Sequence, residues 1–278
     1  MGGLGDEIRK KLTKKVAFPL LNRLIGDRGD HLYHYSAEMD RLFPIRTFDW
    51  RTYRFLSTGE LDSDRWWRSL CDLELRGGII FDVGANTGYT AAWFSTLADR
   101  VYAFEPDPTN LEILREQIRI RGLTNVDVLA TAVGETVGYA RLHRKERGGH
   151  HALSDVGASP TMDTIEVPCT TVDTVMSSEG IESVALLKVD VEGFEPEVLR
   201  GAAAGLSSGA IQRVVFEYSP EFYRRRDVDE RGVTTFLQKL GFDLRLPDGT
   251  RFAADGARTE EQCDLLAFAP GVQPTGIG

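Results

Sequence analysis

The residues best suited to chemistry lie in one short stretch, 79–90, with the sequence IIFDVGANTGYT. An apolar run ends in Asp82, and the small residues Gly84, Ala85 and Gly88 follow before helix-forming sequence resumes. This pattern predicts a buried strand that turns sharply into a helix. Glycines at 84 and 88 would let backbone N–H groups approach a ligand closely, and a helix N-terminus favours a negative group. We therefore expect a site for a nucleotide-type cofactor.

The spacing of this stretch differs from a dinucleotide-binding fingerprint. That fingerprint is GxGxxG, whereas here a carboxylate, Asp82, precedes Gly84 and the next glycine is Gly88. S-adenosylmethionine has no pyrophosphate; it presents an ammonium, a carboxylate and a sulfonium, which suit an acidic residue beside backbone donors. Glu105 follows about 20 residues downstream at a predicted strand end, where a carboxylate can bind both ribose hydroxyls. The two features together predict an S-adenosylmethionine site.

Length, composition and charge are those of one α/β domain with an appendage. The chain has 278 residues, of which 42% are hydrophobic and 27% charged. Its formal charge of −9 argues against nucleic acid as the principal partner. Three scattered cysteines are too few for a disulfide framework or a spaced zinc site, which fits a reducing compartment. The apolar run 16–21 contains Pro19 and is short for a signal or spanning segment, so we expect a cytoplasmic protein without stable membrane insertion.

The first 75 residues precede the regular part of the sequence. Residues 6–26 place apolar positions at helical spacing between basic ones, which indicates an amphipathic helix. Such a helix could dock on the main domain or on a partner, and a peripheral membrane contact is physically allowed. The stretch 27–75 is rich in aromatic and charged residues and has no repeat. We expect a helical and irregular N-terminal cap, through which a homo-oligomer could form.

From residue 76 to 270 the sequence alternates between strand and helix patterns, which predicts a mostly parallel sheet with right-handed crossovers. Asp107 as N-cap, Pro108 at the first helical position and Gly122 at the end define a helix particularly well. The loop 144–160, between two probable antiparallel strands, is the expected substrate-facing insertion, and 271–278 should be a frayed tail. The predicted strands are 79–83, 101–105, 126–131, 137–143, 164–169, 184–191, 213–218, 242–246 and 264–269.

Four segments of the chain resemble the FkbM family of S-adenosylmethionine-dependent methyltransferases. They are DVGANTG (82–88), FEPDP (104–108), LLKVDVEGFEPEVLRGA (186–202) and VVFEYSP (214–220), and the similarity covers residues 79–245. The resemblance implies the Rossmann-like sheet of class I methyltransferases, with seven strands and the last antiparallel strand beside the fifth. It also implies methyl transfer, usually to a hydroxyl oxygen.

A second group of carboxylates is expected at the carboxyl edge of the same sheet. Asp190, Glu192 and Glu195 follow one buried strand and Glu217 ends the next, so parallel strands bring them to the edge where ligands bind. One role is proton abstraction from an acceptor hydroxyl by Asp190, Glu192 or Glu217. Another is a divalent cation such as Mg²⁺, held by Asp190 and Glu217, that lowers the hydroxyl pKa. For Glu195 the ordinary interpretation is a charged side chain in the first turn of a helix.

Two further groups have a functional and an ordinary interpretation. His150 and His151 lie in the glycine-flanked loop RGGHHALS, where they could act as a base or contact the acceptor, or simply be solvated. The run 224–226 contains three arginines, which could clamp an anionic acceptor or form a solvated face.

The sequence thus predicts an S-adenosylmethionine-dependent O-methyltransferase that acts on a hydroxyl of a sugar or other small-molecule natural product, such as a glycoside or a polyketide. A carboxylate or amine acceptor is the nearer alternative, and a non-catalytic binding subunit with a cofactor fold is the more distant one. The residues expected to bind the cofactor are Asp82, Gly84, Ala85, Asn86, Thr87, Gly88, Glu105, Pro106, Thr131, Ala132 and Asp190.

Overall fold

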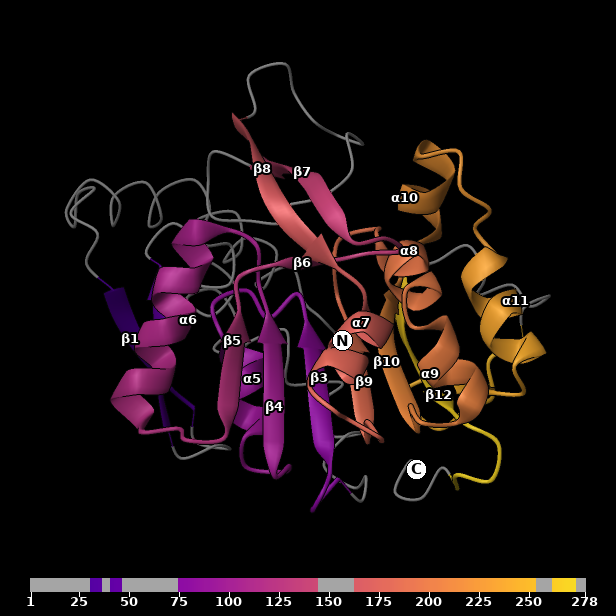
Figure 1. Ribbon diagram of the computed structural model, residues 1–278, viewed down its shortest axis with the longest axis horizontal. Helices are drawn as coiled ribbons and strands as arrows, with labels where there is room; N and C mark the ends of the chain where they lie inside the picture. Colours follow the sequence, from indigo (N-terminus) through magenta and orange to yellow (C-terminus); the bar gives the residue numbers. More distant parts are fainter. Residues whose placement is uncertain (1–30, 37–40, 47–74, 145–162, 254–261, 274–278) are drawn as a thin grey trace, which may run out of the picture. The chain divides into compact units, whose positions relative to one another are not determined.

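The computed structural model describes residues 31–36, 41–46, 75–144, 163–253 and 262–273. The chain divides into two units, of which the first comprises Met1–Arg68 and Lys145–Gly149 and the second Ser69–Arg144 and His150–Gly278. Figure 1 shows the helices and strands of the described residues.

The described part of the first unit is a β-hairpin. Strand β1 (His31–Ser36) pairs antiparallel with β2 (Arg41–Arg46). Over these residues the expectation of a helical or irregular cap is therefore wrong, because short stretches rich in aromatic and apolar residues pair well as strands. The amphipathic helix predicted for 6–26 and the remainder of the cap lie outside the described residues.

The second unit is built on a seven-stranded sheet with the order β11-β12-β10-β9-β3-β4-β5. Neighbours from β10 to β5 run parallel, whereas β12 is antiparallel to both β10 and β11. This confirms the predicted sheet, including its last antiparallel strand beside the fifth. The strands are β3 (Ile79–Val83), β4 (Arg100–Phe104), β5 (Val126–Leu129), β9 (Leu186–Val189), β10 (Arg213–Tyr218), β11 (Asp243–Arg245) and β12 (Cys263–Phe268).

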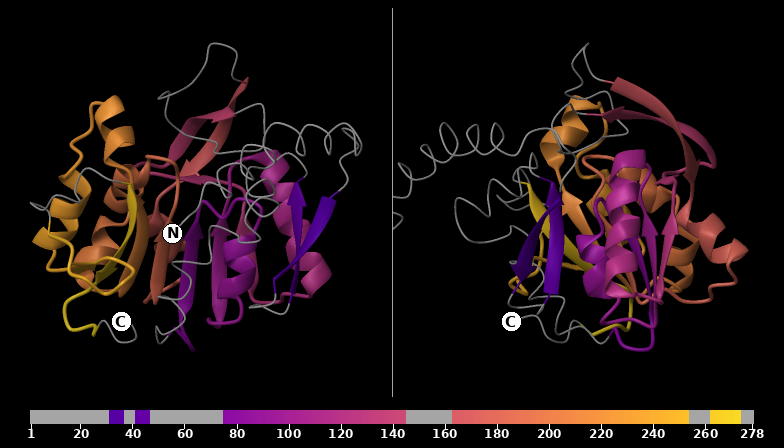
Figure 2. Two further views of the ribbon diagram at one scale, coloured as in Figure 1. Left: turned by 180° about the vertical axis from the view of Figure 1, so that it is seen from behind. Right: turned by 90° about the vertical axis from the view of Figure 1, so that its left-hand side faces the viewer.

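Helices cover both faces of this sheet (Figure 2). The central strands are consequently buried on both sides: all four residues of Leu186–Val189 are buried, as are Ile80–Val83 and Val101–Phe104. This explains why these strands appear in the sequence as continuous apolar runs rather than as alternating patterns. At the C-terminus, Val272 packs against the same core, so the frayed tail predicted for 271–278 does not begin before residue 274.

The helix signals in the sequence differed in strength. Helix α6 (Pro108–Arg121) has the predicted caps, because the Asp107 carboxylate accepts the backbone N–H groups of Thr109 and Asn110 and Gly122 ends the helix in the left-handed conformation. Helix α11 (Gly232–Lys239) buries Val233 and Leu237 on one side and is followed by Gly241 with a positive φ. Among the described helices, none has the length and apolar character needed to cross a membrane. The remaining helices are α5 (Tyr89–Phe94), α7 (Val172–Ser178), α8 (Glu195–Arg200), α9 (Ala203–Ser208) and α10 (Pro220–Arg225).

An insertion between β5 and α7 forms a second, three-stranded sheet with the order β6-β8-β7. Strands β7 (Gly138–Arg144) and β8 (Asp163–Thr170) pair antiparallel as predicted, and the short β6 (Ala132–Val133) pairs parallel with β8. Ala132, Leu142 and Val167 form its small core. Most of the expected substrate-facing loop 144–160, including His150 and His151, lies outside the described residues.

Gly84 is required by a close approach between two loops. Its φ is +76°, and a Cβ at this position would lie 2.0 Å from the backbone oxygen of Asp190. Gly122 also has a positive φ, +61°, but a Cβ there would have no heavy atom within 4 Å. The two glycines therefore share the backbone conformation and differ in the space available.

We expect Gly84→Ala to lower the free energy of unfolding by about 3 kcal/mol or more, since backbone strain and a clash add. Gly122→Ala, as the matched control, should cost about 1 kcal/mol from backbone strain alone. Urea unfolding of both variants measures the difference. Equal losses would show that the approach to Asp190 is not tight.

Candidate active site

The turn after β3 is fixed to the end of β4 by its own N–H groups. The backbone nitrogens of Gly84 and Ala85 donate to the Phe104 carbonyl at 3.1 and 2.9 Å, and the nitrogen of Asn86 donates to Glu105 Oε2 at 2.8 Å. These three N–H groups are therefore engaged within the protein, and the contact of Gly84, Ala85 and Asn86 with a cofactor stays a prediction. The glycine turn is a rigid connection between two strand ends.

Glu105 lies where the sequence predicted, at the end of β4 beside this turn. Its Oε1 accepts the backbone N–H of Asp107 at 2.8 Å and the side-chain amide of Asn110 at 3.4 Å, while Oε2 accepts from Asn86. Burial raises the pKa of Glu105 to about 7, and the hydrogen bonds from Asp107 and Asn86 oppose the rise. Because a carboxylate has about four acceptor positions, Glu105 can still accept a ligand hydroxyl.

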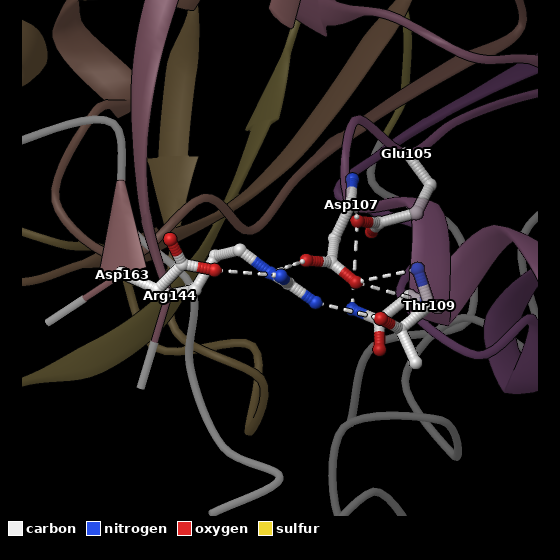
Figure 3. Close-up of polar contacts among 6 residues, drawn as sticks. Glu105, Asp107, Thr109, Arg144 and Asp163 are labelled. Atoms are coloured by element: carbon white, nitrogen blue, oxygen red, sulfur yellow. Dashed lines mark hydrogen bonds and ion pairs between the residues drawn. The ribbon is translucent and has the colours of Figure 1, made fainter. Parts of the chain in front are cut away.

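Arg144, which the sequence reading missed, joins the insertion to this region (Figure 3). It lies at the end of β7, and its guanidinium donates to Asp107 Oδ2 at 2.7 Å, Thr109 Oγ1 at 2.7 Å and Asp163 Oδ2 at 2.9 Å. Asp107 is fully buried and uses its other oxygen to cap α6. Arg144 therefore holds the β7–β8 hairpin to the residues that follow Glu105.

The other predicted cofactor contacts surround the turn and the end of β5. Thr87 and Pro106 are half-buried, Gly88 is the N-cap residue of α5, and Ala132 is buried. Thr131 Oγ1 lies 3.0 Å from the carbonyl oxygens of Ala132 and Pro168, which links β5 to the insertion. Their contact with a cofactor stays a prediction.

Lys188 is a second functional candidate that the sequence reading missed. Its side chain is buried in β9, and its Nζ lies 3.1 Å from Asp82 Oδ1, 2.8 Å from the Gly84 carbonyl oxygen and 3.6 Å from Asp190 Oδ2. Asp82 is fully buried as well, and its Oδ2 accepts the hydroxyl of Thr90 at 2.5 Å. Asp82 thus has internal partners for both oxygens. A lysine inside the apolar run LLKVDV was the signal that could have revealed this ion pair.

Asp190 and Glu217 come together at the carboxyl edge of the sheet, as predicted, and Asp264 joins them. Glu217 opposes Asp264 across the β10–β12 ladder, and its carboxylate accepts from Gln262 at 2.6 Å and Ser219 at 3.1 Å. We call Asp190, Glu217 and Asp264 the acidic cluster. Burial, reinforced by the charge of Asp190, raises the pKa of both Glu217 and Asp264 to about 7.

The predicted metal function of this cluster has weaker support. Among the described residues, no group of three or more His, Cys, Asp or Glu side chains is placed to hold a metal ion. Asp190 is the most accessible member, with 39% of its side chain exposed. Glu192 is half-buried in the adjoining loop and has the left-handed φ of +55°.

Glu195 lies in the first turn of α8, as the sequence suggested, but its side chain is completely buried. Its Oε1 accepts the backbone N–H groups of Val191 and Gly193, each at 3.1 Å, and its Oε2 lies 3.1 Å from the hydroxyl of Tyr223. The Tyr223 hydroxyl also donates a hydrogen bond to the Glu217 carbonyl oxygen at 3.1 Å, which leaves the hydroxyl oxygen free to accept from a protonated Glu195. Burial raises the pKa of Glu195 to about 8, and the charge of Glu217 adds to this rise.

The arginines at 224–226 are engaged within the protein. Arg224 pairs with Glu230 and Arg225 with Glu221 near the surface. Arg226 is nearly buried: it donates to the Gly193 carbonyl, pairs with Glu197 at 2.7 Å and stacks over the Phe194 ring at 4.8 Å. Arg226 therefore stabilises the loop after β9 from its outer side, and Glu195 stabilises the same loop from the protein interior. Because the three arginines already have partners within the protein, the predicted clamp for an anionic acceptor lacks support.

The strand order and the site at the carboxyl edge are those of a class I methyltransferase. Residues 82–244, more than half of the chain, match the model of the methyltransferase FkbM domain, and the chain belongs to this family.

Three curated relatives are similar to the chain. The hexuronic acid methyltransferase AglP of Haloferax volcanii is 31% identical over 163 residues, which cover 58% of this chain and 62% of AglP. The 2-O-methyltransferase NoeI of Sinorhizobium fredii is 24% identical, covering 64% of this chain and 78% of NoeI. The 31-O-demethyl-FK506 methyltransferase FkbM of Streptomyces tacrolimicus is 32% identical, covering 46% and 61%. The matched region thus spans less than two thirds of AglP and of FkbM.

Glu195 gives a prediction about pH. Its pKa is about 8 in the folded protein and near the usual 4.5 in the unfolded chain, so between these values the unfolded state binds fewer protons. The contribution of Glu195 to stability is present below pH 4.5 and is lost as pH rises to 8, by up to about 1.4 kcal/mol per pH unit. Glu195→Gln mimics the protonated acid and removes this dependence.

The measurement is urea unfolding of the wild type and Glu195→Gln between pH 5 and 9. We expect similar stability at pH 5 and a growing advantage for the variant toward pH 8. Glu182→Gln, at an exposed position, is the control and should follow the wild type. A constant difference between Glu195→Gln and wild type across this range would contradict the assignment of a protonated Glu195.

Proposed function

We propose that the protein transfers a methyl group from S-adenosylmethionine to a hydroxyl oxygen of a sugar or another small-molecule natural product. The observation that carries this proposal is the arrangement on one sheet edge: Glu105 beside the glycine turn, and the acidic cluster at the ends of β9 and β10. Family membership supports methyl transfer, and the names of the relatives NoeI and FkbM both specify an oxygen acceptor.

The residues present fit the cofactor. Glu105 offers a carboxylate for the ribose hydroxyls, and the turn at 84–88 lies directly beside it. S-adenosylmethionine, when bound, supplies a methyl group activated by the positive sulfur. The part of the protein is to hold the acceptor oxygen in line with that methyl group and to exclude water.

The acidic cluster is suited to remove the acceptor proton. As the acceptor oxygen bonds to the methyl carbon and the carbon–sulfur bond breaks, the hydroxyl proton passes to a carboxylate and S-adenosylhomocysteine leaves. Asp190 is the accessible member, and pKa values of about 7 at Glu217 and Asp264 are close to the operating pH of a general base. Among the described residues, no group of three or more His, Cys, Asp or Glu side chains is arranged to hold a metal ion, so we prefer this base to a divalent cation held by Asp190 and Glu217.

A carboxylate acceptor is a second candidate, because the name of AglP specifies a hexuronic acid, which carries both hydroxyls and a carboxylate. A carboxylate needs no base, so the two candidates differ in their need for Asp190. Four expectations from the sequence stay predictions. They are a base or acceptor contact from His150 or His151, a cytoplasmic location, assembly through the N-terminal cap and the absence of a nucleic-acid partner.

Loss of the Glu105 carboxylate should weaken cofactor binding. We expect Glu105→Ala to raise the Kd for S-adenosylhomocysteine at least about 10-fold in titration calorimetry, because hydrogen bonds to a charged group are lost. Glu116→Ala, which removes a carboxylate that pairs with Arg119 on the surface of α6, is the matched control and should bind normally. Wild-type affinity in Glu105→Ala would disprove the ribose assignment.

Asp190→Asn tests the acceptor-side proposal. With labelled S-adenosylmethionine and a panel of glycosides and hexuronates, a hydroxyl acceptor predicts a fall in kcat of about 100-fold with unchanged cofactor affinity. Asp127→Asn, at an exposed position in β5, is the control. Full activity in Asp190→Asn on a hexuronate would favour a carboxylate acceptor, and loss of turnover with chelator would favour the cation.

A further inference from the structure

Lys188 is a buried cation that methyl transfer itself does not require. Its side chain is only 2% exposed, and it lies in a strand whose other members are apolar. An ammonium group in such a place costs several kcal/mol of desolvation unless charges and hydrogen bonds compensate it. Its partners therefore indicate what the residue does.

These partners lie at the end of β3 and in the loops that follow β3 and β9. Lys188 is opposite Asp82 in the register of β9 and β3. From there its Nζ reaches the carbonyl oxygen of Gly84 at 2.8 Å, the carbonyl oxygen of Val83 at 3.3 Å and the Asp190 carboxylate at 3.6 Å. A single side chain thus contacts both the cofactor turn and the acceptor-side loop.

The contact with Gly84 fixes one peptide plane of the turn. In a trans peptide the carbonyl of Gly84 and the N–H of Ala85 point in opposite directions. The carbonyl accepts from Lys188 and the N–H donates to the Phe104 carbonyl at 2.9 Å, so this peptide is held from both sides. Asn86, the next residue, donates to Glu105 at 2.8 Å, so the orientation of that peptide determines where the turn meets Glu105.

We propose that Lys188 is a positioning residue for the cofactor: it holds the Gly84 peptide so that the turn and Glu105 together present a preformed binding surface. This inference rests on the proposed function. A purely structural role would consist only of neutralising Asp82, which is fully buried. The two roles differ in what happens when both charges are removed together.

The experiment compares Lys188→Met, Asp82→Asn and the double variant with the wild type. Lys188→Met alone leaves a buried, unpaired carboxylate and should lower Tm strongly. In the double variant no buried charge is left unpaired, so Tm should recover to within about 5 °C of the wild type. The double variant should still bind S-adenosylhomocysteine at least about 10-fold more weakly in calorimetry, because the Gly84 carbonyl has lost its donor.

The matched control removes another cross-strand pair of the same sheet. Arg100 and Asp127 pair at 2.6 Å between β4 and β5, away from the turn. Arg100→Met/Asp127→Asn should keep wild-type affinity. Asp82→Asn/Lys188→Leu is the substitute if the Met double variant does not fold, since leucine also offers no hydrogen-bond donor to the Gly84 carbonyl.

Wild-type affinity in a double variant of wild-type Tm would overturn the positioning role and leave the proposed function intact. Failure of the wild-type protein itself to bind S-adenosylhomocysteine would overturn the proposed function, and the inference with it. The two failures are therefore distinguishable in one series of titrations.

Discussion

The ion pair between Lys188 and Asp82 is the interaction on which the architecture of the site depends. It joins β9 and β3, the neighbouring strands from which the chain winds outward in opposite directions. In open α/β sheets, ligands bind beyond the carboxyl ends of strands at such a reversal. A buried pair contributes little net stability, because desolvation offsets much of the attraction. Its consequence is geometric: it ties the Gly84 turn and Asp190 to one common point.

The same burial that makes this pair necessary also sets the chemistry around it. Glu105, Glu217 and Asp264 all have a pKa raised to about 7, with desolvation as the main cause in each case. For Glu217 and Asp264 the positive charge of Lys188 opposes this rise. Lys188 therefore affects the carboxylates in two ways, since it fixes the position of Asp190 and limits how far its neighbours become protonated.

Features encoded by neighbouring residues could be predicted from the sequence. The apolar run before Gly84 predicted strand β3. The bounds of helix α6 were predicted to within a residue from Asp107, Pro108 and Gly122. Glu105 was found because it ends a strand at a recognisable distance from the turn. The short helices α7 and α10 were missed because about two turns of helix give no clear periodicity.

Residues whose role depends on register or burial could not be predicted in the same way. Asp264 reaches Glu217 only through the antiparallel ladder of the last strand, and Arg144 reaches Asp107 only because the insertion folds back over α6. The contact of Arg144 with Asp107 places the end of β7 beside Glu105, because Glu105 in turn accepts the backbone N–H of Asp107. In the part of the insertion that the structure describes, Arg144 and Thr131 tie it to the strand ends rather than to the Gly84 turn, and a loop supported in this way can change without altering the scaffold beneath it.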